Sequence, residues 1–492
     1  MIQSIDYAAI APPLILALAA GLVLLLDAFL GRPRAPGFAA LGGVLLSTAA
    51  VAWLAVEGAG RATFCIPGEL RGGGPASCSY VADRFTLVIS AVMLGAAVVV
   101  VLLSMTELAR GDVPAGEWYF LLLCAFAGAV ALPASRDLVM LVVSLELVSL
   151  PVFVLAALRR YDGRAGEAAL KLFLVSVVST AVMLFGASLV YGVTGEIHLE
   201  RIAAVLAGAR FTDAVPAPGA GAPVAVAGVV LVLAGFAFKV AAVPFHFWAG
   251  DVYRGAPVPV AALLSVISKA AGFAGLILLF TLAFPALRGV WGPLVAVLAA
   301  ATMTVGNLLA LRQRHAVRLL AWSSVAQSGY ILAPLASADR GAVPASVAYL
   351  ALYAAMNMGA FAVVAVVART RAGNELDDYR GLWAVSPWSA AALGFFLVCL
   401  AGLPPGLAGL FAKIVVFREV VAGGLGWLAI VMAINTVIGL YYYIAWAGRL
   451  FAAVRPGRAV PVTAPAGVAV AIALVATGVF SALPQLAISA LG

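Results

Sequence analysis

The stretch "AGFAFKVAAVPFHFWAGDVY", Ala234–Tyr253, begins like an apolar helix that crosses a membrane and then departs from that pattern. Lys239 lies inside the apolar run, Pro244 follows five residues later, and His246 comes directly after Phe245. A membrane helix interrupted by proline is tolerated where its freed backbone groups line a polar cavity or are covered by protein. The stretch therefore predicts a broken membrane helix with a titratable amine beside the break.

The composition of the whole chain is that of an integral membrane protein. Of its 492 residues, 65% are hydrophobic and only 10% are charged, so lipid must solvate most of its length. The net charge of +8 comes from arginines scattered through short loops, and no basic run with interleaved aromatic residues is present. The charge is therefore interpreted as a determinant of membrane topology, and nucleic acid is excluded as a partner.

Apolar segments of membrane-spanning length recur along the entire chain. Each is long enough to cross a hydrocarbon core of about 30 Å, and the short connections leave no room for a soluble domain. Helical periodicity fits them better than the alternation of a β-barrel. The sequence predicts an all-α protein with about fourteen spans, centred near residues 20, 47, 94, 125, 148, 180, 232, 270, 298, 326, 356, 398, 435 and 477.

The seventh and twelfth spans are interrupted in similar ways. The twelfth contains "GLPPGLAGLFAK", Gly402–Lys413, in which two prolines and three glycines precede a lysine. Paired interruptions in two halves of a chain are typical of inverted-repeat transporters with sites near the midplane of the membrane. We expect a three-helix segment (1–116), two inverted five-helix repeats (117–285 and 286–450) and a final helix (451–492).

The arginines of the loops predict the orientation. With the N-terminus outside, 16 loop arginines face the cytoplasm and 7 face the other side, which agrees with the positive-inside rule and places both termini outside. The polar loop that holds Cys65 and Cys78 then faces an oxidising compartment. The two thiols can pair there or remain free, and both alternatives stay open.

Lysine and arginine are partitioned in an informative way. The chain has 25 arginines and only four lysines, and each lysine, unlike the loop arginines, falls inside a predicted span: Lys171, Lys239, Lys269 and Lys413. Arginine cannot release its proton in a protein, whereas desolvation can lower the pKa of a buried lysine by several units. Lys171, near the start of its span, can alternatively extend its amine to the membrane surface. The partition favours proton transfer within the membrane.

Two further titratable residues accompany the lysines. Glu146 lies near the middle of the fifth span, where an unpaired carboxylate is costly, so we expect it to face Lys171 or Lys239. His246 follows Lys239 by seven residues, about 10 Å along an ideal helix and on the same face. It is a candidate relay between Lys239 and Lys269, and the alternative is a packing residue.

The tenth span, "LLAWSSVAQSGYIL", is unusually polar. Its hydroxyl and amide groups can hold a chain of water molecules or can form hydrogen bonds between helices. No phosphate-binding loop, dinucleotide fingerprint or cysteine cluster is found in the sequence. Nucleotide hydrolysis and electron transfer therefore have no site in this chain, and the energy for transport must come from a partner or from an ion gradient.

At this level of detail the chain resembles the antiporter-like membrane subunits of the proton-pumping NADH–quinone oxidoreductase, respiratory complex I. The resemblance covers nearly the whole chain, and "FKVAAVPFHFWAGDVYRGAPVPVAALLSVISKAAGFA", Phe238–Ala274, carries it most specifically. The segments "NLLALRQRHAVRLLAWSSVAQSGY", "LDDYRGL" and "INTVIGLYYYI" also match. A lysine at position 413 and a chain that stops soon after its last span favour the N type over the M and L types.

The resemblance implies a charged axis across the membrane midplane, formed by Glu146, Lys239, Lys269 and Lys413, with Lys171 and His246 as relay sites. It also implies a bacterial inner-membrane location and partner membrane subunits. NADH oxidation and quinone reduction, with FMN and iron–sulfur clusters, would belong to other subunits, and this chain would hold no cofactor. The alternatives are a subunit of a multisubunit cation/proton antiporter and a scaffold that does not transport.

Overall fold

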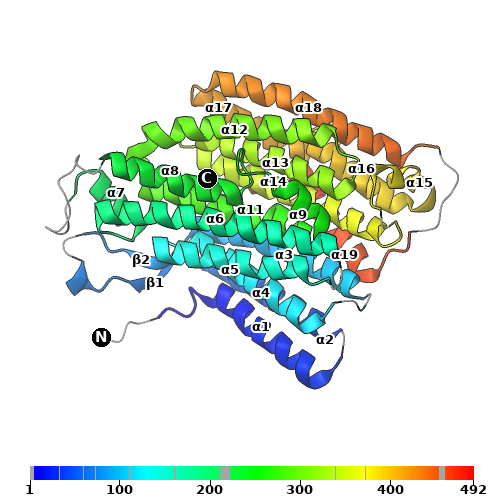
Figure 1. Cartoon of the computed structure of the whole chain (residues 1–492), viewed down its shortest axis with the longest axis horizontal. Coiled ribbons are helices and arrows are strands. Elements are labelled where there is room, and N and C mark those ends of the chain that lie inside the picture. The colour runs from blue at the N-terminus through cyan, green and yellow to red at the C-terminus, as the bar shows by residue number, and fades with distance from the viewer. Residues whose placement is uncertain are drawn as a thin grey trace.

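The protein is seen here as a computed structural model, which describes residues 5–32, 34–58, 60–71, 74–109, 111, 113–159, 162–209, 211, 222–337, 339–371, 373–453 and 460–491. Long helices lie side by side and make up most of the described structure (Figure 1). A two-stranded antiparallel hairpin, β1 (Arg61–Cys65) and β2 (Cys78–Ala82), is the exception. The all-α membrane fold expected from the sequence is confirmed.

The bounds of the helices are as follows. Up to the eighth predicted span they are α1 (Ala11–Leu30), α2 (Ala35–Glu57), η1 (Gly68–Leu70), α3 (Arg84–Leu108), α4 (Ala115–Ala131), η2 (Leu132–Ala134), α5 (Leu138–Ala157), α6 (Gly163–Thr194), α7 (Leu199–Leu206), α8 (Ala222–Lys239), α9 (Ala249–Gly255), α10 (Val258–Leu263), η3 (Leu264–Ser268), α11 (Lys269–Leu278) and η4 (Leu279–Ala283). The remaining ones are η5 (Pro285–Leu287), α12 (Arg288–Leu311), α13 (Ala316–Leu335), α14 (Ala342–Ala368), η6 (Leu376–Tyr379), α15 (Leu382–Val385), α16 (Pro387–Ala401), α17 (Leu407–Ala422), α18 (Gly426–Leu450), α19 (Ala464–Ala482) and α20 (Gln485–Ile488).

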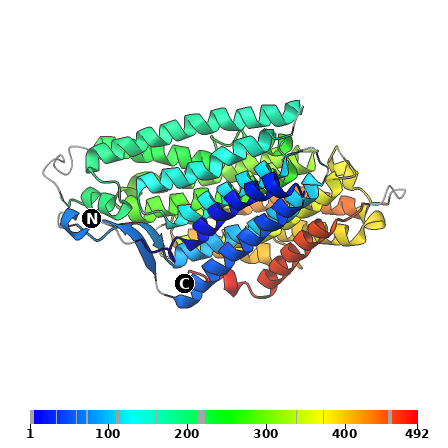
Figure 2. The same ribbon diagram turned by 90° about the horizontal axis from the view of Figure 1, so that it is seen from below.

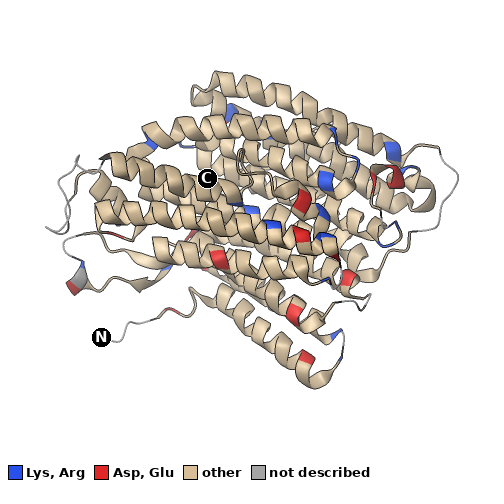
Figure 3. Ribbon diagram, in the orientation of Figure 1, with Lys and Arg blue, Asp and Glu red and all other residues tan. Residues whose placement is uncertain are grey.

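Among the described residues, 11 helices are long and apolar enough to cross a membrane, and two shorter apolar helices cover Pro223–Lys239 and Pro387–Ala401. Every one of the fourteen predicted span centres falls inside a described helix. Figure 3 shows that Lys, Arg, Asp and Glu occupy only short segments of these helices. The inverted relation of the two five-helix units stays a prediction.

Both described ends of the chain lie at the hairpin end of the helix bundle (Figures 1 and 2). Near the N-terminus, the Asp6 amide donates to Thr63 Oγ1 in β1 over 3.1 Å. Near the C-terminus, the Arg84 Nε at the start of α3 donates to the carbonyl of Ala490 over 2.7 Å. The membrane side on which this end lies stays a prediction. Five arginines of the orientation count lie outside the described residues: Arg110, Arg160, Arg210, Arg455 and Arg458.

The two predicted helix breaks are present. Helix α8 ends at Lys239, and α9 begins only at Ala249, with no regular helix between them. Helix α16 ends at Ala401, and α17 begins at Leu407 after the two prolines of the twelfth span. Because the chain leaves the helical path at residue 240, the expectation that His246 lies two helical turns beyond Lys239 on the same face is wrong.

The eighth span contains a feature that the sequence did not predict. Its helix is interrupted by two π-helical turns, η3 and η4, which flank α11. Lys269 is the first residue of α11 and directly follows η3. A π-helical turn adds a residue to the helical turn and is frequent at functional sites. The lysine of this span therefore begins a helical segment that is bounded by irregular turns on both sides.

Candidate functional site

The amine of Lys239 lies in a polar pocket formed by helices α5 and α6. Its Nζ donates to Ser149 Oγ over 2.7 Å and to Ser176 Oγ over 3.0 Å, and it lies 3.4 Å from Glu146 Oε1. Glu146 and Ser149 are three residues apart on α5 and therefore share a face of that helix. Of the two lysines expected as partners of Glu146, the structure places Lys239 beside it.

The carboxylate of Glu146 has a second donor. Thr180 on α6 donates from Oγ1 to Glu146 Oε1 over 2.7 Å, and Thr180 lies four residues after Ser176 on the same helical face. The Glu146 side chain is 23% exposed, whereas that of Lys239 is only 6% exposed. Each charged group thus has neutral hydroxyl partners that remain if the two charges move apart.

A small cavity adjoins the Lys239 amine. It has a volume of about 20 Å³, and its polar lining consists of Lys239, Ser149, Ser176 and Ser268. A polar cavity above roughly 10–15 Å³ can hold a water molecule. Ser268 immediately precedes Lys269 in the chain. The cavity therefore lies between Lys239 and Ser268, the residue directly before Lys269.

Lys269 is enclosed by neutral acceptors from α13. Its Nζ donates to the Ser324 carbonyl over 2.6 Å, to Ser324 Oγ over 2.8 Å and to Ser328 Oγ over 3.0 Å, and the residue is only 1% exposed. Three acceptors match the three donors of an ammonium group. Within the part of the chain that the structure describes, no carboxylate forms an ion pair with Lys269.

The other polar residues of α13 bind neighbouring helices. Gln327 donates from Nε2 to the Tyr443 hydroxyl over 3.2 Å, and its Oε1 accepts from the Tyr349 hydroxyl over 2.5 Å. Ser323 also contacts the Tyr443 hydroxyl. The Tyr330 ring stacks with the Tyr349 ring at a centroid distance of 6.0 Å. The tenth span thus shows the second predicted use, because two of its serines hold Lys269 and its other polar groups join helices α14 and α18. Its use for a chain of water molecules stays a prediction.

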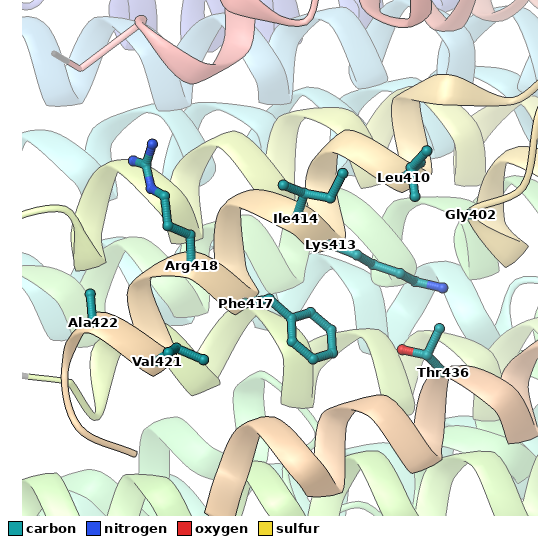
Figure 4. Close-up of a pocket in the computed structure, with 9 residues that line it drawn as sticks. All are labelled: Gly402, Leu410, Lys413, Ile414, Phe417, Arg418, Val421, Ala422 and Thr436. Carbon is teal, nitrogen blue, oxygen red and sulfur yellow. The ribbon is translucent and has the colours of Figure 1, made fainter. Parts of the chain in front are cut away.

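Lys413 on α17 lies at the end of a groove between α17 and α18. Its Nζ donates to the Ala401 carbonyl over 2.6 Å and lies 6.0 Å from the centre of the Tyr330 ring. Figure 4 shows the Lys413 side chain extending toward Gly402 and Thr436, away from Arg418. The groove has a volume of about 700 Å³ and is lined mainly by apolar residues of α17. The twelfth-span lysine therefore lies at an open apolar groove, and the Ala401 carbonyl is its one hydrogen-bond acceptor among the described residues.

Lys171 and His246 lie outside these contacts. Lys171 Nζ pairs with Glu167 Oε1 at 2.7 Å and with Asp251 Oδ2 at 3.1 Å, so the structure does not bring it to Glu146. The His246 ring contacts the Trp322 ring edge to face at 5.7 Å. Among the described residues, His246 forms no hydrogen bond or ion pair with Lys239 or Lys269. The relay role of both residues stays a prediction.

Cys65 and Cys78 form a disulfide that joins the two strands of the hairpin at paired positions. The hairpin contacts the start of α5, because the Arg136 amide before that helix donates to the Ser79 carbonyl over 2.8 Å. His198, which precedes α7, approaches Ser79 Oγ at 3.4 Å through Nε2, and burial lowers the pKa of its imidazole. The disulfide thus cross-links the two strands of the hairpin that packs at one end of the bundle.

Sequence reasoning missed the hydroxyl partners of the first lysine. Ser149 follows Glu146 by three residues, and Ser176 and Thr180 are four residues apart in an otherwise apolar span. This spacing marks shared helical faces and is the signal that would have found them. Asp251, the partner of Lys171, was also missed, although it lies inside the opening stretch of sequence. Among the described residues, no group of three or more His, Cys, Asp or Glu side chains could hold a metal ion.

The chain was compared with known proteins. Residues 135–439 match the family model described as NADH:quinone oxidoreductase/Mrp antiporter, transmembrane. A relative from Streptomyces griseus subsp. griseus, "NADH-quinone oxidoreductase subunit N 2", is 55% identical over 463 residues, which is 92% of this chain and 84% of the relative. This match to subunit N agrees with the N-type resemblance found in the sequence.

Solved structures show the same relationship. A chain of respiratory complex I from Thermus thermophilus with bound aureothin is 29% identical, with a TM-score of 0.75 over 97% of this chain and 98% of that chain. A chain of the Mrp complex from Dietzia sp. DQ12-45-1b is 20% identical, with a TM-score of 0.81 over 98% of this chain and 96% of that chain, a likeness that shows the fold alone. The chain belongs to the NADH:quinone oxidoreductase/Mrp antiporter membrane-subunit family, in its subunit N branch.

Proposed function

We propose that this proton-translocating subunit N of NADH–quinone oxidoreductase moves protons through Glu146, Lys239, Lys269 and Lys413, without redox chemistry of its own. The observation that carries this assignment is the set of three lysines buried among helices, two of which have only neutral acceptors within the described structure. A buried ammonium without a carboxylate is held weakly enough to lose its proton, whereas a fixed ion pair is not.

Proton transfer begins at the Glu146–Lys239 pair. While the two groups are 3.4 Å apart, the carboxylate stabilises the Lys239 ammonium. Quinone reduction in partner subunits changes the electric field at Glu146 and separates the pair, with Thr180 retaining the carboxylate. The Lys239 proton then has a route through a water molecule in the adjoining cavity, past Ser268, to Lys269.

The second transfer follows α13. Ser324 and Ser328 hold Lys269, and Gln327 on the same helix accepts from the Tyr349 hydroxyl. The Tyr349 ring stacks on the Tyr330 ring, which lies 6.0 Å from Lys413 Nζ. A hydroxyl oxygen both donates and accepts hydrogen bonds, so the Ser and Tyr hydroxyls can pass a proton without carrying a lasting charge. Lys413 at the open groove is the terminal proton carrier of the chain. Lys171 and His246 are accessory relay sites that the path through Glu146, Lys239, Lys269 and Lys413 does not require.

The setting of the subunit follows from the same proposal. The chain assembles with other membrane subunits of the complex in the bacterial inner membrane, and other subunits hold FMN and iron–sulfur clusters and reduce the quinone. The hairpin end, with the Cys65–Cys78 disulfide and both termini, faces the periplasm. The chain is organised as a three-helix segment (1–116), two inverted five-helix repeats (117–285 and 286–450) and a final helix (451–492).

Two measurements test this function. Replacing Lys239 and Lys269 together by alanine should lower the number of protons pumped per electron, and an unchanged number in the assembled complex would overturn the assignment. The matching family model also includes the Mrp antiporter in its description, so a cation/proton antiporter is the second candidate. A mass-spectrometric inventory of the native assembly separates the two, since flavin and iron–sulfur subunits accompany only the oxidoreductase.

A further inference from the structure

The short helix α9 is wedged between α6 and α13. A Cβ atom at Gly250 would lie 2.6 Å from the Trp322 ring on α13, and one at Gly255 would lie 2.5 Å from the Ala168 Cβ on α6. Both distances are shorter than real Cβ contacts, so glycine is required on each side for the observed approach. Figure 1 shows α9 directly after the break in the seventh span, where it contacts both long helices.

Asp251 on α9 forms ion pairs with both of these helices. Its Oδ2 lies 3.1 Å from Lys171 Nζ on α6, and its Oδ1 lies 3.2 Å from Arg318 on α13. The Asp251 side chain is 43% exposed, and exposed ion pairs are individually weak. One carboxylate thus joins two helices through two contacts that can each break and re-form.

The two contacts are not equivalent. Lys171 has a second carboxylate, Glu167, at 2.7 Å and so stays paired when it leaves Asp251. Arg318 has no second carboxylate among the described residues, and its buried Nε has no hydrogen-bond partner there. The two ion pairs of Asp251 form one bridge between α6 and α13. Its contact with Lys171 on α6 therefore opens more easily than its contact with Arg318 on α13.

The two helices joined by Asp251 carry the acceptors of the two central lysines. Lys171 precedes Ser176, an acceptor of Lys239, by five residues, or about 7.5 Å along the helix. Arg318 precedes Ser324, an acceptor of Lys269, by six residues, or about 9 Å. A shift of α6 relative to α13 therefore changes how the two lysine sites are placed relative to each other.

Asp251 also fixes the chain beside the first site. Three residues before it, Trp248 lines the cavity next to Lys239, and its indole Nε1 donates to the Phe238 carbonyl over 3.3 Å. The segment that closes this cavity is thus continuous with the helix that carries the bridge.

From this arrangement we infer that Asp251 is a positioning residue that couples the Lys239 and Lys269 sites through its shared ion pairs with Lys171 and Arg318. With both pairs formed, α6 and α13 hold their serines at the observed spacing and Trp248 closes the cavity. When Lys171 leaves Asp251 and keeps only its ion pair with Glu167, α6 is released from α13. The proton path between Lys239 and Lys269 is then interrupted. This role rests on the function proposed above, because it presupposes that both lysines carry protons.

The test uses the assembled complex reconstituted in liposomes, with NADH oxidation and proton pumping measured together. Asp251→Asn should lower proton pumping per NADH by about two- to fivefold, as expected for the loss of weak exposed ion pairs, while NADH oxidation with an uncoupler persists. Asp251→Glu should restore most of the pumping. Glu167→Gln, which removes the other partner of Lys171, is the matched control and should pump like the parent complex.

Combining variants of Lys171 and Asp251 distinguishes an ion-pair role of Lys171 from a proton-relay role. Lys171→Met should lower pumping as much as Asp251→Asn does, and the double variant should be no worse than either single variant. Lys171→Arg keeps the ion pair but cannot release a proton, so it should retain pumping. Normal pumping in Asp251→Asn, additive losses in the double variant, or loss of pumping in Lys171→Arg would each overturn the bridge.

Two further results keep the test decisive. If Asp251→Asn prevents assembly, the contrast between Lys171→Met and Lys171→Arg decides in its place. If Lys239→Met abolishes pumping while Asp251→Asn pumps normally, only the bridge is wrong. If Lys239→Met itself pumps like the parent complex, the proposed function is wrong, and the coupling role of Asp251 is overturned as well.

Discussion

Replacing Glu146 by glutamine removes the charge that faces Lys239 and leaves the shape of the side chain nearly unchanged. The Thr180 hydroxyl can still donate to the side-chain oxygen, so the local hydrogen bond survives. At the observed 3.4 Å, two unit charges attract by about 5 kcal/mol at an effective dielectric constant of 20 and by about 1 kcal/mol in bulk water. The partial exposure of Glu146 places the interaction between these limits.

Even the lower limit has a measurable consequence. A change of about 1 kcal/mol alters the equilibrium between the paired and separated positions of Lys239 about fivefold. We therefore expect Glu146→Gln to lower the number of protons pumped per NADH, measured in liposomes that contain the assembled complex. NADH oxidation in the presence of an uncoupler should continue, because the redox reaction belongs to other subunits.

The matched control is Glu57→Gln, which removes a carboxylate paired with Arg61 at 2.5 Å near the hairpin. This variant should pump like the parent complex. The double variant with Lys239→Met should be no worse than Lys239→Met alone, because Glu146 acts through that lysine. Pumping by Glu146→Gln equal to that of the parent complex would refute the reasoning from the ion pair.

Three other predictions concern separate parts of the molecule. Lys413→Arg should lose pumping as Lys413→Met does, since arginine does not release its proton, while Arg418→Gln in the same groove should retain it; equal pumping by Lys413→Arg and the parent would contradict a proton-carrying role. Replacing Cys65 and Cys78, 13 residues apart, by serine should destabilise the hairpin by about 3 kcal/mol and increase its hydrogen exchange, and alkylation of both thiols without a reductant would count against the disulfide. Burial and nearby arginines lower the pKa of His315 to about 4, so the unfolded chain binds the extra proton first and stability should fall as the pH drops from about 6.5 to about 4. His315→Gln should flatten the pH dependence of the unfolding free energy in that window by less than ~3 kcal/mol. The melting temperature measured across this pH range is the readout, and an unchanged pH dependence would contradict the burial argument.

The sequence predicted the spans and their breaks because both depend on local composition. Apolar runs must reach across the bilayer, and the prolines around residues 244 and 404 cannot continue a regular helix. The position of Lys239 at the end of α8 follows from the same rule. The π-helical turns beside Lys269 could not be predicted in this way, since no residue in "LLSVIS" marks a shift of backbone hydrogen bonds.

The contacts of the site were less predictable than its members. Glu146 and the lysines stand out in the sequence as charges inside apolar helices, but their partners depend on how the helices are rotated against one another. Ser149 and Ser176 meet at Lys239 from two different helices, which no local pattern indicates. His246 was misplaced because helical spacing was extended through a proline break, where the chain no longer follows a helix.

The central claim is that the buried lysines release protons, and Lys269→Arg tests it most directly. Arginine keeps a positive charge and hydrogen-bond donors in the cradle of Ser324 and Ser328, but it cannot be deprotonated in a protein. The measurement is the number of protons pumped per NADH by the assembled complex in liposomes. We expect this number to fall while uncoupled NADH oxidation persists, and a number equal to that of the parent complex would contradict proton transfer through Lys269.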